Sequence, residues 1–191
     1  MLINGAQLTG TNVQNLSIGQ SRLTKVNLAE SRLPRFDLHD VEIADCNLSN
    51  LKSPDGLFRR TIFSQSKLTG INLAGSSFGD VEFVNCIIDF ALFERATLKQ
   101  VTFRNCQMRD VSFANTTFDR VAFIECDLGR ASFDRVRTAA SEMRHCTMNG
   151  MRGLNQLSGM AMEWNDILAH ADLFAGALGI TVAGAAGEDG P

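Results

Sequence analysis

A large apolar residue recurs at every fifth position over about three quarters of this 191-residue chain. The series runs from Ile3 to Met148, and of its thirty members only Ser53 and Thr138 are not apolar. An α-helix repeats its buried positions roughly every 3.6 residues and a β-strand every second residue, so neither element gives a strict period of five. The chain must therefore turn a corner after each unit of five residues.

A second series of positions lies two residues before the first and carries mostly small side chains. Cys86, Cys106, Cys126 and Cys146 belong to it and recur every twenty residues, and Cys46 falls on the same count. Since nearly all residues between the two series are polar, we expect both series to point inward. The spacing of the cysteines then marks one full coil of the chain.

The cysteine column is best explained by packing, because a thiol is a small group that is readily buried. Stacked coils lie about 4.8 Å apart, which exceeds the Cβ separation of roughly 3.5–4.5 Å that a disulfide needs. Ligands in a straight column also cannot surround a metal ion tetrahedrally. The sequence therefore predicts buried, reduced thiols and no cofactor or metal site.

Several units of five residues resemble the A(D/N)LXX unit of the pentapeptide repeat family. They are Val26–Glu30, Cys46–Asn50, Ile71–Gly75 and Cys126–Arg130. The resemblance covers roughly residues 3 to 150, and it implies an all-β solenoid. In that family the solenoid is a right-handed quadrilateral β-helix with four units and about 20 residues per coil. We accordingly expect residues 1–150 to form a repeat domain of this kind.

Positions twenty apart should stack in such a coil, and this predicts columns of phenylalanine in the core. The predicted ladder residues are Phe63, Phe83, Phe103 and Phe123 in one column and Phe93, Phe113 and Phe133 in another. The face that carries the cysteines, which we call the cysteine face, has no Phe at its central positions. Each coil can bury its inward residues only against its neighbours, so stability should be roughly a sum over coils.

One unit interrupts the pattern at residues 52–56, where Ser53 takes the central position and Pro54, Asp55 and Gly56 supply turn chemistry. The period continues unchanged on both sides of this unit. We therefore predict a distorted unit or small bulge, and we favour a tolerated irregularity over a recognition loop.

The repeat fades after residue 150, and a helical pattern follows it. Asn165 is placed to cap a helix over about 165–178, and Gly179 is placed to end it. We expect residues 151–182 to hold the last coil, this capping helix and a dimerisation segment, with a short strand over 180–182. The tail 183–191 is expected to be disordered.

A solenoid needs an end cap, because its last coil exposes apolar surface and unpaired backbone. The helix carries apolar residues on two sides, so one side can cover the last coil and the other can meet a second chain. The predicted cap and dimer residues are Trp164, Ile167, Leu168, Ala171, Leu173, Phe174 and Leu178. This segment resembles the mycobacterial MfpA and Qnr branch, which implies a homodimer through residues around 150 to 182.

The net charge and the distribution of charged residues indicate which class of partner is expected. The net charge is −3 and the pI about 5.6, which does not suit direct binding of nucleic acid. Residues 1 to 150 hold sixteen acidic and seventeen basic residues, so no face of the repeat region is a continuous negative stripe. The remaining acids gather at the cap, where Glu163, Asp166 and Asp172 form a possible acidic partner surface.

Members of the MfpA and Qnr branch bind DNA gyrase, mimic duplex DNA and protect the enzyme from fluoroquinolones. The resemblance thus implies a bacterial, non-enzymatic protein that binds this type II topoisomerase. The alternative is a scaffold or adaptor that binds another protein through its flat faces. Its most basic face carries Arg32, Lys52, Arg35, Arg95 and Arg135.

An enzyme is not expected, because no nucleophile, acid–base pair or phosphate loop is evident. Cys146 lies at an inward position and His145 at an outward one, so these two side chains should diverge. The sequence shows no run of about eighteen apolar residues and no signal-peptide pattern. We therefore expect a cytoplasmic protein that does not enter membranes.

Overall fold

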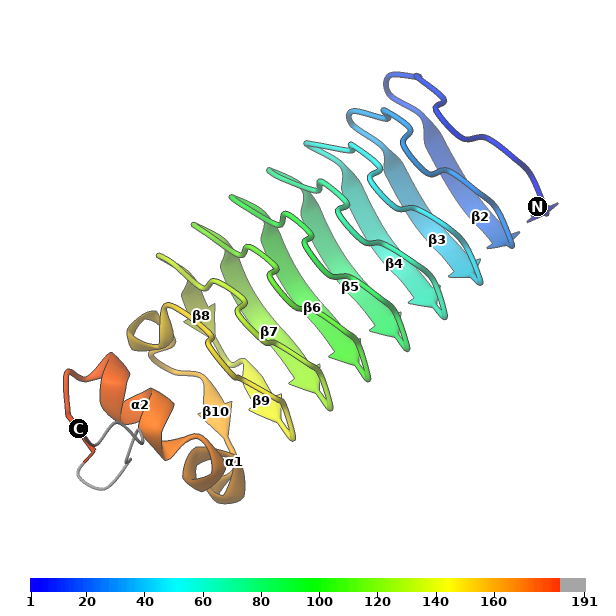
Figure 1. Ribbon diagram of the computed structural model, residues 1–191. Coiled ribbons are helices and arrows are strands. Elements are labelled where there is room, and N and C mark those ends of the chain that lie inside the picture. Colours follow the sequence, from blue (N-terminus) through cyan, green and yellow to red (C-terminus); the bar gives the residue numbers. More distant parts are fainter. Residues whose placement is uncertain (183–191) are drawn as a thin grey trace, which may run out of the picture.

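The chain forms a parallel β-solenoid, as seen in the computed structural model, which describes residues 1–182. Coils of the chain stack side by side into a rod, with the N-terminus at one end and two short helices at the other (Figure 1). The strands are β1 (Leu2–Asn4), β2 (Ser17–Thr24), β3 (Asp37–Ala44), β4 (Leu57–Ser64), β5 (Ser77–Val84), β6 (Thr97–Arg104), β7 (Thr117–Ile124), β8 (Arg137–Ala139), β9 (Glu142–Arg144) and β10 (Ala161–Met162). The helices are the 3-10 helix η1 (Leu154–Gln156), α1 (Trp164–Ala169) and α2 (Ala171–Ala177).

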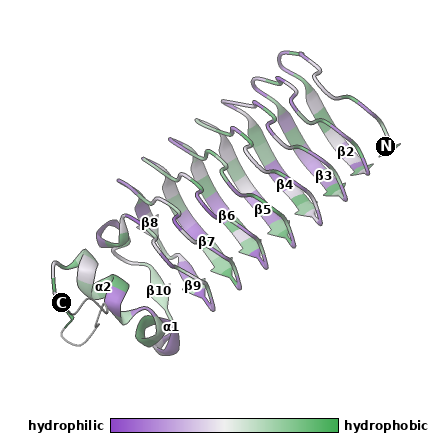
Figure 2. Cartoon of the chain, viewed as in Figure 1, coloured by the Kyte–Doolittle hydropathy of each residue, from purple (hydrophilic) through white to green (hydrophobic). Residues whose placement is uncertain are grey.

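Neighbouring coils from β1 to β9 pair in parallel with an offset of twenty residues, and β10 pairs with β9 at an offset of nineteen. Leu38 of β3 lies opposite Phe58 of β4, and Ile43 lies opposite Phe63. On the other two sides of each coil the pairing consists of isolated bridges, such as Asn27 with Asn47. The register keeps hydrophobic residues inside and hydrophilic residues outside, so the two kinds alternate along the coils (Figure 2). The predicted β-helix with about 20 residues per coil is confirmed.

The corners of the coil have a left-handed backbone at every fifth residue. Asn50, Asp55 and Arg60, for example, have φ values of 56°, 56° and 45°. Glycine, asparagine and aspartate adopt this region most readily, and the chain places many of them at these corners. Each coil thus has four corners and four faces, and each face carries one unit of five residues.

The unit at residues 52–56 is regular, so the prediction of a distorted unit or bulge is wrong. Ser53 is fully buried at the central position, and its hydroxyl donates a hydrogen bond to the carbonyl of Leu33 at 3.0 Å. The polar side chain is therefore satisfied inside the core. Gly56 occupies the small inward position because a Cβ there would lie 2.8 Å from the ring of Phe58.

The core is a set of stacked aromatic columns. Phe63, Phe83, Phe103 and Phe123 form one column with ring centroids 4.7, 4.8 and 5.1 Å apart. Phe93, Phe113 and Phe133 form a second column at 5.2 and 5.1 Å. Neighbouring columns meet edge to face, as Phe83 and Phe93 do at 89°. These arrangements are the favourable ones for aromatic rings, and they fill the interior of the rod.

The C-terminal cap differs from the single helix expected over about 165–178. Two short helices, α1 and α2, meet at His170, whose φ of −125° and ψ of 27° break the helical path. Helix α1 begins at Trp164, so Asn165 lies inside it and is not its cap. Residues 180–182 form no strand, and the predicted disordered tail 183–191 lies outside the described residues. Neither helix has the length and apolar character needed to span a bilayer.

Candidate functional site

The interior of the rod is filled with closely packed side chains. All five cysteines are buried and free, and the thiol of Cys86 lies 3.5 Å from the carbonyl oxygen of Phe63 in the coil below. Burial raises the pKa of the Cys46 thiol, and the neighbouring sulfur of Cys126 raises that of Cys106. Residues 1–182 contain no cluster of His, Cys, Asp and Glu that could hold a metal ion. The groups that could meet a partner therefore lie on the outer surface.

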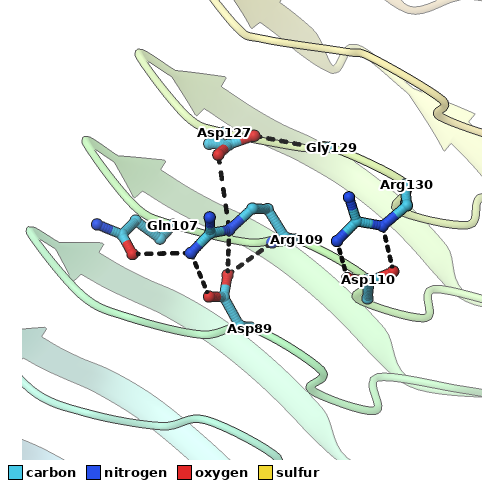
Figure 3. Close-up of polar contacts among 7 residues, drawn as sticks. All are labelled: Asp89, Gln107, Arg109, Asp110, Asp127, Gly129 and Arg130. Carbon is cyan, nitrogen blue, oxygen red and sulfur yellow. Dashed lines mark hydrogen bonds and ion pairs between the residues drawn. The ribbon is translucent and has the colours of Figure 1, made fainter.

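Most outward acidic groups of the cysteine face are paired with arginines of neighbouring coils. Arg109 reaches Asp89 at 2.9 Å and Asp127 at 3.7 Å, and it also donates to the side-chain oxygen of Gln107 (Figure 3). Asp89 is nearly buried, and it accepts the backbone N–H of Arg109 at 2.8 Å. Because this carboxylate is nearly buried and has these partners, it is held in a fixed position at the edge of the surface.

A second pair on the same face, and a third on the opposite face, follow this rule. Arg130 makes a two-pronged contact with Asp110 at 2.8 and 2.6 Å (Figure 3), and Arg60 makes the same contact with Asp40. The arginine in each pair lowers the pKa of the carboxyl below its ordinary value. Because the acids are neutralised, this surface does not resemble the uniform charge of a phosphate backbone.

The basic face lies on the side of the rod whose central residues include Leu33, Phe93 and Phe133. Its predicted basic residues are Arg32, Lys52, Arg35, Arg95 and Arg135, and Arg32 and Lys52 are stacked in register. Within residues 1–182 these five side chains make no ion pair. The structure thus places unpaired positive charge on this face.

The backbone N–H groups of each coil donate to carbonyls of the next coil. In the seventh coil, the N–H of Glu125 donates to the carbonyl of Arg144 at 2.9 Å, and that of Leu128 donates to the carbonyl of Thr147 at 2.8 Å. The last coil has the same two N–H groups but no following coil on this face. Unless other groups replace the missing carbonyls, these N–H groups would be unsatisfied.

Two side chains of the cap replace them. A carboxylate oxygen of Asp166 accepts the N–H of His145 at 2.8 Å, and Nε2 of His170 accepts the N–H of Met148 at 3.3 Å. Nδ1 of His170 lies 3.0 Å from the carbonyl of Asp166, so it carries the ring proton and donates it there. The break in the helix at His170 allows this contact.

The two sides of the cap differ in burial. Leu173 and Phe174 of α2 pack against the core cluster, whereas Trp164, Leu168 and Leu178 are 69%, 56% and 73% exposed. Of the other predicted cap residues, Ile167 is half-buried and Ala171 exposed. Leu173 and Phe174 therefore lie on the side of the cap that covers the rod, and Trp164, Leu168 and Leu178 lie on its open side.

The predicted acidic surface of the cap is also only partly present. Asp166 is buried and holds the last coil, so it is not available to a partner. Glu163 is half-buried with a carboxylate oxygen 3.7 Å from Nε2 of His145, and Asp172 is exposed on α2. His145 and Cys146 do not make a reactive pair, since the thiol of Cys146 contacts backbone carbonyls instead.

Sequence reasoning missed one surface feature, an exposed phenylalanine at a corner. Phe90 is 57% exposed, and the other corner residues from Gly5 to Gly150 are glycine, alanine or polar residues. The signal was present in the period, because positions divisible by five form their own series. That series had no structural meaning until the left-handed corners were known.

Comparisons with known proteins agree with the repeat. Residues 56–133 match the family model described as a pentapeptide repeat region, and no curated protein matches the sequence. Two trypsin-treated variants of QnrB1, a plasmid-mediated fluoroquinolone resistance protein, resemble the fold with TM-scores of 0.60 and 0.54. Each is 14% identical to this chain, and the match covers 95% of it and 97% of QnrB1.

The likeness to QnrB1 shows a shared fold along nearly the whole length of both chains. Residues 56–133 thus resemble the pentapeptide repeat region in sequence, and the five-residue period and the stacked coils of twenty residues continue on both sides of this segment.

Proposed function

We propose that this protein is a non-enzymatic interaction module that dimerises through its C-terminal cap and binds DNA gyrase. The exposed apolar side chains of the cap carry the dimer part of this proposal. Trp164, Leu168 and Leu178 are more than half exposed, although they lie next to residues that are packed. Exposed apolar groups gathered at one end of a soluble rod are typical of a protein interface.

Ile180 and Val182 extend this apolar surface, since they are 57% and 45% exposed. The cap lies at the end of the rod (Figure 1), so two caps that meet about a two-fold axis would produce a rod of double length. An interface of this kind is isologous and closes after two chains. The free thiols suit a reducing compartment, so a cytoplasmic location is part of the proposal.

Light scattering coupled to gel filtration tests the dimer. We expect a mass of twice 20.9 kDa for the wild type and a monomer for Leu168→Glu. Ile62→Glu is the matched control, because Ile62 is 43% exposed on β4, far along the rod from the cap. A wild-type protein that remains monomeric at micromolar concentration would contradict the dimer.

The gyrase part rests on the shared fold with QnrB1, which is a fluoroquinolone resistance protein. The test is a supercoiling assay that combines ciprofloxacin, this protein and gyrase from the same source organism. We expect inhibition of supercoiling or protection from the drug. The absence of both effects at tens of micromolar of this protein would contradict gyrase as the partner.

A scaffold that binds another protein through a flat face is the second candidate. The observation in its favour is the basic face, where Arg32, Lys52 and Arg95 have no ion-pair partner within the described residues. If gyrase is unaffected while the protein still dimerises, this second function is favoured.

A further inference from the structure

Phe90 stands at a corner where the fold favours small or polar residues. Its φ is 60°, and a bulky side chain in this left-handed region is strained. Of the thirteen phenylalanines of the chain, Phe90 alone is exposed, while eleven are buried and Phe174 is half-buried. Neither core packing nor local backbone preference accounts for an aromatic ring at this position.

Two further apolar residues of the same coil lie beside Phe90. Ile87 is 37% exposed on the cysteine face, and Leu92 is half-buried on the basic face. Phe90 occupies the corner between these two faces. We call Ile87, Phe90 and Leu92 the Phe90 patch, and it crosses the corner near the middle of the rod.

Of the carboxylates around this patch, Glu94 accepts a hydrogen bond from the hydroxyl of Ser112 at 3.0 Å and forms no ion pair within the described residues, whereas Asp89 and Asp110 are paired with arginines. Asp89 is held by Arg109 at 2.9 Å, and Asp110 is held by Arg130 at 2.6 Å. The first pair joins the coil that carries Phe90 to the next coil toward the C-terminus, and the second joins that coil to the one after it, as Figure 3 shows for the four paired residues. They are part of the surface and leave no unpaired negative charge at these two positions.

Basic residues without such partners lie on the same coil as the patch and on the two coils before it. Lys67 lies in register with Ile87 on the preceding coil, and Lys52 lies in the same column as Leu92, two coils earlier. Arg95 occupies the next corner of the coil that carries Phe90. Within residues 1–182, none of these three side chains forms an ion pair.

We propose that the Phe90 patch binds an acidic peptide segment of a partner protein through an apolar side chain of that segment. The ring of Phe90 supplies the apolar anchor, and Lys67, Lys52 and Arg95 receive the carboxylates. Aromatic residues with apolar neighbours and a polar rim are the usual centres of protein interfaces. The excess of positive charge selects an acidic partner segment by complementarity.

This inference rests on the proposal that the rod binds proteins, but it requires neither the cap dimer nor gyrase. The test uses fluorescence anisotropy of a short fluorescein-labelled peptide in which Asp and Leu alternate. We expect saturable binding to the wild type that weakens as salt is added. Matched peptides that alternate Asp with Ser, or Lys with Leu, should bind at least about tenfold more weakly.

Phe90→Asn is the decisive variant, because asparagine suits the left-handed corner and occupies the equivalent corner at Asn50. We expect about a tenfold loss of affinity in a protein that remains folded. Ile62→Thr is the control, since it removes an exposed apolar side chain from a different face, and it should bind like the wild type. Arg95→Glu should weaken binding and reduce its salt dependence.

Three outcomes would overturn the proposal. They are unchanged binding to Phe90→Asn, equal binding of the Lys–Leu peptide, and preferential binding of a single-stranded DNA oligonucleotide of similar length. Leu168→Glu separates this inference from the proposed function, because a monomeric cap variant should still bind the peptide. A wild-type protein that dimerises but does not bind the Asp–Leu peptide would refute the Phe90 patch alone.

Discussion

The imidazole Nε2 of His170 accepts the backbone N–H of Met148 at 3.3 Å. One coil earlier, the equivalent N–H of Leu128 donates to a backbone carbonyl at 2.8 Å. A side chain of the cap therefore continues the backbone ladder for one more step. The break between the two short helices of the cap lies at the same residue, His170.

Replacing His170 by alanine should loosen the cap. We expect a loss of about 1–2 kcal/mol in the free energy of unfolding, because the N–H of Met148 loses its acceptor. Denaturant unfolding measures this loss, and hydrogen exchange of the Met148 amide locates it. His170→Gln should recover part of the protection, whereas Asp172→Asn, at an exposed site on α2, should change little. Equal protection of Met148 in all variants would contradict this role.

Replacing Phe90 by asparagine should stabilise the fold. The wild-type ring is held at a φ of 60°, a conformation that costs most side chains roughly 1–2 kcal/mol and asparagine less. We expect a gain of about 1 kcal/mol and a rise in Tm of roughly 2–4 °C. Differential scanning calorimetry provides the measurement. A lower Tm would mean that the ring stabilises the coil in a way that its exposure does not reveal.

Replacing Phe103 by alanine should be among the most costly changes in the core. Its ring stacks between Phe83 at 4.8 Å and Phe123 at 5.1 Å and is fully buried. We expect a loss of about 3–5 kcal/mol from the lost packing and the cavity. Phe90→Ala removes the same side chain from an exposed site and is the control. Similar losses at both positions would show that the aromatic column contributes no special stability.

The pair of Asp110 and Arg130 should make the stability of the folded protein depend on pH in the acidic range. Arg130 lowers the pKa of Asp110 below its ordinary value of 3.8, so this carboxylate stabilises the folded protein above about pH 4. That contribution should disappear as the pH falls through the lowered pKa. Unfolding midpoints recorded over roughly pH 2 to 6 would show the effect. Asp110→Asn should lessen the acid sensitivity, and an unchanged acid profile would contradict this.

The sequence alone determined the coil, because the five-residue pattern that specifies it is local and is repeated many times. Ile3, Leu23, Ile43 and Phe63 each require the same inward position twenty residues apart, so one irregular unit cannot shift the register. Even Ser53, which the sequence marked as a disruption, keeps its place by donating a hydrogen bond to the carbonyl of Leu33. The columns of phenylalanine follow from the same count.

The tertiary structure decided the cap and the surface, because each depends on contacts that are made once. Helical spacing predicted one continuous helix, but the helix breaks at His170, whose Nε2 accepts the N–H of Met148. Asp166 was expected to face a partner, yet the N–H of His145 draws it inward. The position of Phe90 was visible in the sequence, but only the left-handed corner shows why a ring there is exposed and strained.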